Sequence, residues 1–249
     1  VDDLFAPKRI RAALSANSEA VPFAGLARYW PEGIAKGART WITENITAGT
    51  ATGLHVESVL AGDKGWSSLH EIKRDGGFTA HDLEMWWLRP MPPLQHMTAR
   101  ATFQGTDALL VETPSATLPV DAVGPEAERL RGKAVLQPLS VSDGSMRITG
   151  LNEANQIGTV HLVLAGALRG LMCELANPRL SLLSAHPVPF TEPGGTVRSE
   201  VTVQVPLDSK VAIEQVAVSS RSQMRGAHLG DVACLLYTSP SPRDVEESR

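Results

Sequence analysis

Long runs of alternating apolar and polar residues constrain this chain more than any other feature of its sequence. In residues 97–104 an apolar side chain occupies every odd position and a polar one every even position. In residues 197–205 every alternate position carries valine except Ser199. Because successive side chains of a β-strand point to opposite faces, this period predicts strands with one apolar and one polar face.

Similar segments recur at intervals of roughly ten residues with turn residues between them, which is typical of an antiparallel meander. The further expected strands are 52–60, 78–88, 108–113, 135–139, 146–149, 159–164, 180–184, 211–218 and 222–229. Turns are expected at 142–144 and 152–155, and residues 8–16 could instead form a short helix. If such a sheet stays open, helices, a second sheet or a ligand must cover its apolar face.

Residues 26–49 carry the clearest helix pattern in the chain. Pro31 suits the first helical position, where the missing N–H would have no partner anyway. Gly49 suits the end of the helix, because glycine tolerates the left-handed conformation found there. We therefore expect a helix that leads directly into the first β-rich region.

One face of this helix is apolar, since Ile34, Trp41 and Ile42 recur at helical spacing. A helix of this kind is expected to lie over the apolar side of the sheet. A second short helix is expected at residues 167–175, between Gly166 and the Asn177-Pro178 pair.

Composition suggests an N-terminal segment (1–29), two β-rich blocks (30–122 and 134–233) joined by a connection (123–133), and a tail (234–249). The tail begins CLLYTSPSPRD, a string that resembles a translated sequencing-library adapter. We expect this tail to be non-native and disordered, and the chain to be a fragment of a longer protein.

The charge and the residues capable of chemistry exclude several classes of function. A formal net charge of −4 gives no reason to expect binding to nucleic acid. The seven histidines show no metal-ligand spacing, so no metal site is expected. Cys173 lies in an apolar helical context and is expected to be buried. The longest mainly apolar stretches, such as the one around 160–164, are too short to cross a bilayer.

Motifs for enzymatic chemistry are also missing from the sequence. It contains no phosphate-binding glycine loop, no dinucleotide fingerprint and no nucleophile elbow. Asp82 and Glu84 alternate on one expected strand, and a carbohydrate-active enzyme would need such carboxylates to converge in a pocket. No cofactor and no enzymatic activity are expected.

Three stretches resemble AsmA-like, YhdP-type proteins of Gram-negative bacteria. The first is YWPEGIAKGARTWITENITAGTAT, which matches a recurring segment of that family at Trp30, Pro31, Ala38, Arg39, Trp41, Glu44, Asn45 and Gly49. The second is the hairpin MPPLQHMTARATFQGTDALL, in which Met97 replaces the branched aliphatic residue of the pattern. The third is LSVSDGSMRITGL with HLVLAGALRGLMCELANPRLSLL, which is similar to the family's strand, short helix and P-x-L unit.

This resemblance implies an extended, curved antiparallel sheet that forms an open groove with one apolar face. It also implies a protein anchored in the inner membrane through a region absent here, which crosses the periplasm and carries phospholipid or another acyl lipid toward the outer membrane. Envelope proteins are further possible partners.

The alternating strands independently suggest which residues would line such a groove. The expected lining residues are Leu54, Val56, Met97, Phe103, Val160, Leu162, Leu164, Val197, Val201, Val203 and Val205. Ile34, Trp41 and Ile42 are expected to cover it. Two alternatives stay open: a β-rich envelope scaffold that binds protein partners, and a carbohydrate-active enzyme.

Overall fold

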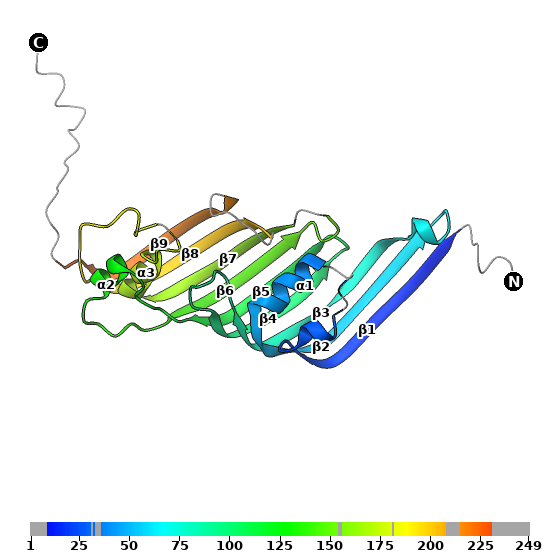
Figure 1. The fold of residues 1–249 in the computed structure, drawn as a ribbon, viewed down its shortest axis with the longest axis horizontal. Coiled ribbons are helices and arrows are strands. Elements are labelled where there is room, and N and C mark those ends of the chain that lie inside the picture. Colours follow the sequence, from blue (N-terminus) through cyan, green and yellow to red (C-terminus); the bar gives the residue numbers. More distant parts are fainter. Residues whose placement is uncertain are drawn as a thin grey trace, which may run out of the picture.

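In the part of the chain that the computed structural model describes, nine strands form one open antiparallel sheet (Figure 1). The described residues are 9–30, 32, 36–153, 156–180, 182–207 and 215–230. Each strand pairs with the next, in the order β1 to β9. The strands are β1 (Ile10–Pro22), β2 (Ile46–Gly62), β3 (His70–Met85), β4 (Leu94–Gln104), β5 (Ala108–Leu118), β6 (Leu139–Thr149), β7 (Ile157–Ala167), β8 (Gly194–Pro206) and β9 (Ala217–His228).

Short helices accompany the sheet within the same ranges. These are α1 (Lys36–Asn45), α2 (Pro125–Arg131) and α3 (Leu168–Leu175), with the 3-10 turns η2 (Leu26–Arg28) and η3 (Trp66–Ser68). The expected mainly-β class, with few short helices and an open sheet, is confirmed. The two expected β-rich blocks are continuous in this sheet, because β5 pairs with β6 along their whole length.

The strand register gives the sheet one apolar face. Residues that pair across antiparallel strands point to the same side. One row of such partners crosses seven strands, from β3 to β9, and consists of Phe78, Ala101, Val111, Met146, Val160, Val203 and Val218. We call the side that carries this row the apolar face. The adjacent row, which includes Arg147, Thr159 and Gln204, points to the opposite, polar face.

The buried core lies on the apolar face near one end of the strands. There Leu118, Leu139 and Val197 are at most 5% exposed and form one cluster with Leu168 and Leu171 of α3. Ile42 of α1 and Ile46 at the start of β2 pack against the same cluster. We call this the covered end of the sheet.

Helix α1 is shorter than expected, and Gly49 does not end it. The described helix runs from Lys36 to Asn45 and β2 begins at the next residue. Gly49 instead lies inside β2 with φ +106°, where the register between β2 and β3 shifts. The sequence could not distinguish these roles, since both need a residue that tolerates positive φ. Pro31 and Ile34 lie outside the described residues.

The N-terminal and middle segments also differ from expectation. Residues 10–22 form a strand, so the suggested helix at 8–16 is wrong over its described part. Residues 135–138 are irregular, and strand β6 runs from Leu139 through the turn expected at 142–144. Asp143 has φ 50° in a β-bulge there, and the bulge uses the same residue types as a turn.

In the later segments the structure has one helix and one irregular stretch that the sequence did not predict. The connection 123–133 contains α2, which has Pro125 at its first turn and acidic residues before basic ones. The segment expected as a strand at 180–184 is irregular where it is described. In place of two strands at 211–218 and 222–229, the described residues hold the single strand β9, and 211–214 lie outside the description.

Replacing Gly49 by alanine should lower the free energy of unfolding. A Cβ there would lie 2.6 Å from Cδ2 of Leu83 and 2.8 Å from the carbonyl oxygen of His81. We expect a loss of about 2–4 kcal/mol from the clash together with the positive φ. Gly53→Ala is the control, because Gly53 has φ +62° but no atom within 4 Å, and about 1 kcal/mol is expected. Equal losses in urea denaturation would contradict the close approach of β2 and β3.

Candidate functional site

The apolar face is only partly covered, and exposure increases away from α3. At the covered end Leu139 and Val197 are 1% and 4% exposed. Toward the opposite, open end, the partners Met146, Val160 and Val203 are each half-buried. The last row, which includes Phe103, Leu109, Ile148 and Val205, is also half-buried. The apolar face therefore offers uncovered hydrophobic surface that spans several strands.

The structure places the expected lining residues together on this one face. Met97 and Val197 belong to its buried part. The others are half-buried: Leu54, Val56, Phe103, Val160, Leu162, Leu164, Val201, Val203 and Val205. Ser199, the polar member of the valine row, is buried and its hydroxyl lies 2.8 Å from that of Ser222. The role of this set in binding lipid remains a prediction.

Several residues of the same face were missed at the sequence level. Leu109, Val111, Met146 and Ile148 continue the rows across β5 and β6. The alternation of Met146, Arg147 and Ile148 indicated this face. The strand expected at 146–149 was shorter than β6, however, so these residues were not recognised as part of the lining. Of the residues expected to cover the face, Ile42 packs on the buried cluster and Trp41 is half-buried.

The carboxylates considered for catalysis, those of Asp82 and Glu84, do not converge in one pocket. Asp82 contacts the ring of His96, with Oδ1 and Nδ1 2.9 Å apart, and both side chains are largely exposed. Glu84 instead accepts a hydrogen bond from the hydroxyl of Thr47 at 2.6 Å. Within the described ranges, no group of three or more His, Cys, Asp or Glu side chains is placed to hold a metal ion.

Helices α2 and α3 pack together at the covered end around a second small core. Ala127, Leu130, Cys173 and Ala176 are buried there, and burial raises the pKa of the Cys173 thiol to about 11. Arg129 donates to Glu126 and to the carbonyl oxygens of Phe190 and Val188. The hydrogen bond from Arg129 lowers the pKa of Glu126. We call helices α2 and α3 with this small core the α2–α3 cap. It holds α3 in place over the covered part of the apolar face.

Glu174 is an unusual member of this cap. It is 4% exposed, and its Oε1 accepts only a long hydrogen bond, 3.4 Å, from the backbone N–H of Asp121. Its Oε2 has no hydrogen-bond partner within the described part of the chain. Burial raises the pKa of Glu174 to about 7, because removal from water disfavours the charged carboxylate.

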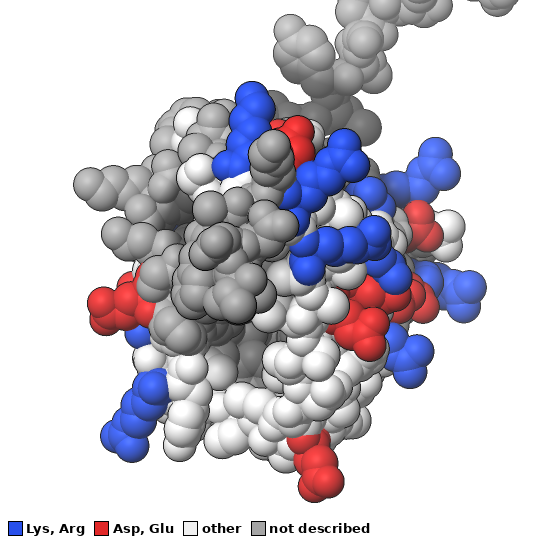
Figure 2. All heavy atoms as spheres, turned by 90° about the vertical axis from the view of Figure 1, so that its right-hand side faces the viewer, with Lys and Arg blue, Asp and Glu red and all other residues white. Residues whose placement is uncertain are grey.

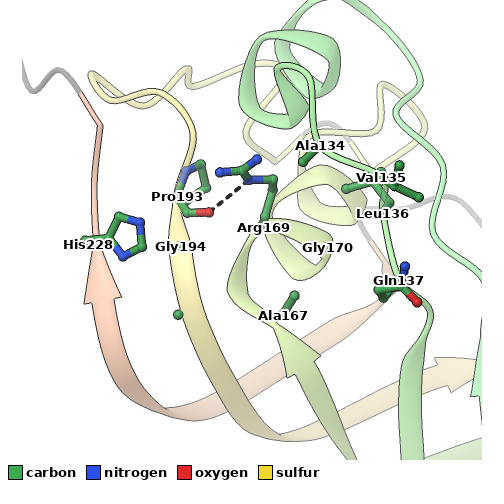
Figure 3. A pocket seen from close by; sticks show the side chains of 11 residues that line it. Ala134, Val135, Leu136, Gln137, Ala167, Arg169, Gly170, Pro193, Gly194 and His228 are labelled. Carbon is green, nitrogen blue, oxygen red and sulfur yellow. Dashed lines mark hydrogen bonds between the residues drawn. The ribbon is translucent and has the colours of Figure 1, made fainter.

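A pocket of about 240 Å³ lies beside the first turn of α3 (Figure 3). The Arg169 guanidinium donates to the carbonyl oxygens of Arg131, Glu192 and Pro193 at 3.1–3.2 Å. Figure 3 shows His228 on β9, beyond the strand that carries Gly194. Because the Arg169 guanidinium already binds these backbone carbonyls, we interpret it as a group that holds α3 to the loop before β8. We do not interpret the pocket as a ligand site.

The charged residues form no single-sign surface in the view that the space-filling picture gives. In Figure 2, Lys and Arg side chains lie beside Asp and Glu side chains. This mixture agrees with the formal net charge of −4.

Comparisons with known proteins found no matching family model, no matching curated protein and no matching solved structure. No helix within the described ranges has the length and apolar character needed to span a membrane.

Glu174→Gln should stabilise the fold at neutral and alkaline pH. The unfolded chain releases this proton near pH 4.3, whereas the folded chain holds it to about pH 7. The wild-type free energy of unfolding should therefore fall as pH rises between these values. At pH 8 we expect the variant to be about 1–3 kcal/mol more stable than the wild type.

Denaturation curves between pH 4.5 and pH 8 would measure this difference. Glu128→Gln is the matched control, because Glu128 lies on α2 and is exposed, and less than about 0.5 kcal/mol is expected. A Glu174→Gln effect that does not change with pH would show that its carboxylate is ionised throughout.

Proposed function

We propose that this chain is a segment of a periplasm-spanning lipid-transfer protein that carries phospholipid between the inner and outer membranes along its apolar face. The observation that supports this most is the apolar row that crosses seven strands, from Phe78 to Val218. Its central members are half-buried. The resemblance to AsmA-like, YhdP-type proteins points to the same function.

The dimensions of the uncovered surface suit an acyl chain. The five strands from β4 to β8 span about 19 Å, since neighbouring strands lie about 4.8 Å apart. Each methylene group removed from water contributes about 0.8 kcal/mol. A continuous apolar row lets a chain move along the face while it exchanges similar contacts, so transfer needs no covalent step.

The polar face supports this assignment from the other side of the sheet. Arg147, Thr159 and Gln204 alternate with the lining residues, so one face can be solvated while the other holds lipid. A protein of this function would be anchored in the inner membrane by a region outside this sequence and would lie on the periplasmic side.

A β-rich scaffold that binds envelope proteins is the second candidate. Every residue of the edge strand β9 is exposed, and its outer edge has no partner strand in the described residues. Such an edge can bind an extended segment of another protein by strand addition. If this second function is correct, the apolar face is an ordinary hydrophobic core and not a lipid-binding surface.

Val203→Asp should weaken the binding of an acyl lipid. The substitution places a carboxylate in the central row, where an acyl chain would have to desolvate it. We expect at least about tenfold weaker binding of the fluorescent fatty acid cis-parinaric acid. Mass spectrometry of the purified wild type should also detect bound lipid.

Gln204→Asp is the matched control, because Gln204 is the next residue of β8 and points to the polar face. It should bind cis-parinaric acid as the wild type does, and circular dichroism should show both variants folded. Failure of the wild type to bind the probe, or equal binding by both variants, would refute lipid transfer along this face.

A further inference from the structure

A polar cluster interrupts the apolar face at its open end. It consists of Ser58 on β2 and Glu71 and Arg74 on β3, and we call it the 58–71–74 cluster. Arg74 pairs with Ser58 in the β2–β3 register, and Gly76, two residues along β3, pairs with the lining residue Val56. Because residues two apart in a strand share a face, Arg74 and Ser58 lie on the apolar face.

The cluster lies where the sheet narrows. Strand β4 pairs with β3 only from Gly77 to Met85, so residues 70–76 extend beyond β4 together with β1 and β2. This three-stranded extension lies at the right of Figure 1. The Cζ atom of Arg74 is 5.3 Å from the ring centroid of Phe103, a lining residue near the end of β4. The cluster therefore borders the last apolar row directly.

The three side chains form a compact arrangement. Arg74 donates from Nε to Oε1 of Glu71 at 3.0 Å and from Nη2 to Oε2. The Ser58 hydroxyl donates to Oε1 of Glu71 at 2.5 Å. The side chains of Arg74 and Glu71 are 20% and 14% exposed. Nη1 of Arg74 has no hydrogen-bond partner among the described residues, so donor capacity remains next to the apolar row.

Stability does not explain an ion pair at this place. Both charges are largely, though not fully, removed from water, which costs free energy, and well-packed apolar residues are often as stable as such an ion pair. The neighbouring positions on the face, Val56 and Phe103, are apolar. Adjacent opposite charges beside an apolar surface instead match a ligand that itself carries adjacent opposite charges and apolar chains.

We propose that the 58–71–74 cluster binds the headgroup of a zwitterionic phospholipid with a primary ammonium, such as phosphatidylethanolamine. Arg74 binds the phosphate through the N–H donors of Nη1, because its Nε and Nη2 donate to Glu71. Glu71 accepts hydrogen bonds from the ammonium, and Ser58 holds the carboxylate in place. The acyl chains extend from Phe103 over the half-buried rows. This inference rests on the proposed function and assigns the headgroup end of the same site.

Lipid extraction from vesicles tests the assignment. The intact chain is incubated with phosphatidylcholine vesicles that carry equal minor amounts of dioleoyl phosphatidylethanolamine and dioleoylglycerol, and the bound lipids are quantified by mass spectrometry. The two minor lipids have the same acyl chains and differ in the headgroup. The wild type should retain phosphatidylethanolamine over dioleoylglycerol by at least about tenfold, which corresponds to about 1.4 kcal/mol.

Variants then assign this preference to the cluster. Arg74→Gln and Glu71→Gln should bring the two lipids to within about twofold of each other, while Arg74→Lys, which keeps the charge, should retain part of the preference. Arg147→Gln is the matched control, because Arg147 is an exposed strand arginine on the polar face. Its preference should equal that of the wild type.

The outcomes separate the two proposals. Equal retention of both minor lipids by the wild type would overturn the headgroup site and leave the lipid-binding face intact, even if no variant could be purified. An unchanged preference in folded Arg74→Gln would overturn it too. If the wild type extracts no lipid of any kind, the proposed function itself fails.

Discussion

Strand register is the constraint on which the rest of this structure depends. Every lining residue reaches the apolar face because each strand pairs with the next in a fixed antiparallel register. A shift of one residue in any strand would transfer its valines to the polar face and its charged residues to the apolar one. The β-bulges at Gly49 and Asp143 keep this register while the chain absorbs extra residues.

The apolar face is covered at one end only, so the residues that stabilise the fold and those proposed to bind lipid lie on different parts of it. At the covered end, α1 and α3 bury a cluster that includes Leu139 and Val197, and hydrophobic burial there can hold the sheet together. At the open end, Val160 and Val203 keep part of their surface accessible. One face can therefore serve as a core over part of its length and as a ligand surface over the rest.

The sequence predicted what depends on side-chain period and missed what depends on backbone geometry. The rows through Phe103 and Val203 followed from alternation alone. Gly49 and residues 142–144 were assigned to a helix end and to a turn, because bulges use the same residue types. The 58–71–74 cluster was also missed, since a bulge in β3 between Glu71 and Lys73 alters the alternation there. No local pattern places an arginine against Phe103, which is 29 residues away in the chain.

The sequential order of the strands has a consequence for how the sheet folds and unfolds. Each strand touches mainly its neighbours in sequence, as units do in repeat proteins, whose stability is a sum of local terms and nearest-neighbour interfaces. Such a sheet can form one strand at a time during synthesis of the chain, because few strand pairings need residues that are distant in sequence. Loss of β9 would then fray one edge, whereas damage near β4 or β5 would divide the sheet into two smaller pieces.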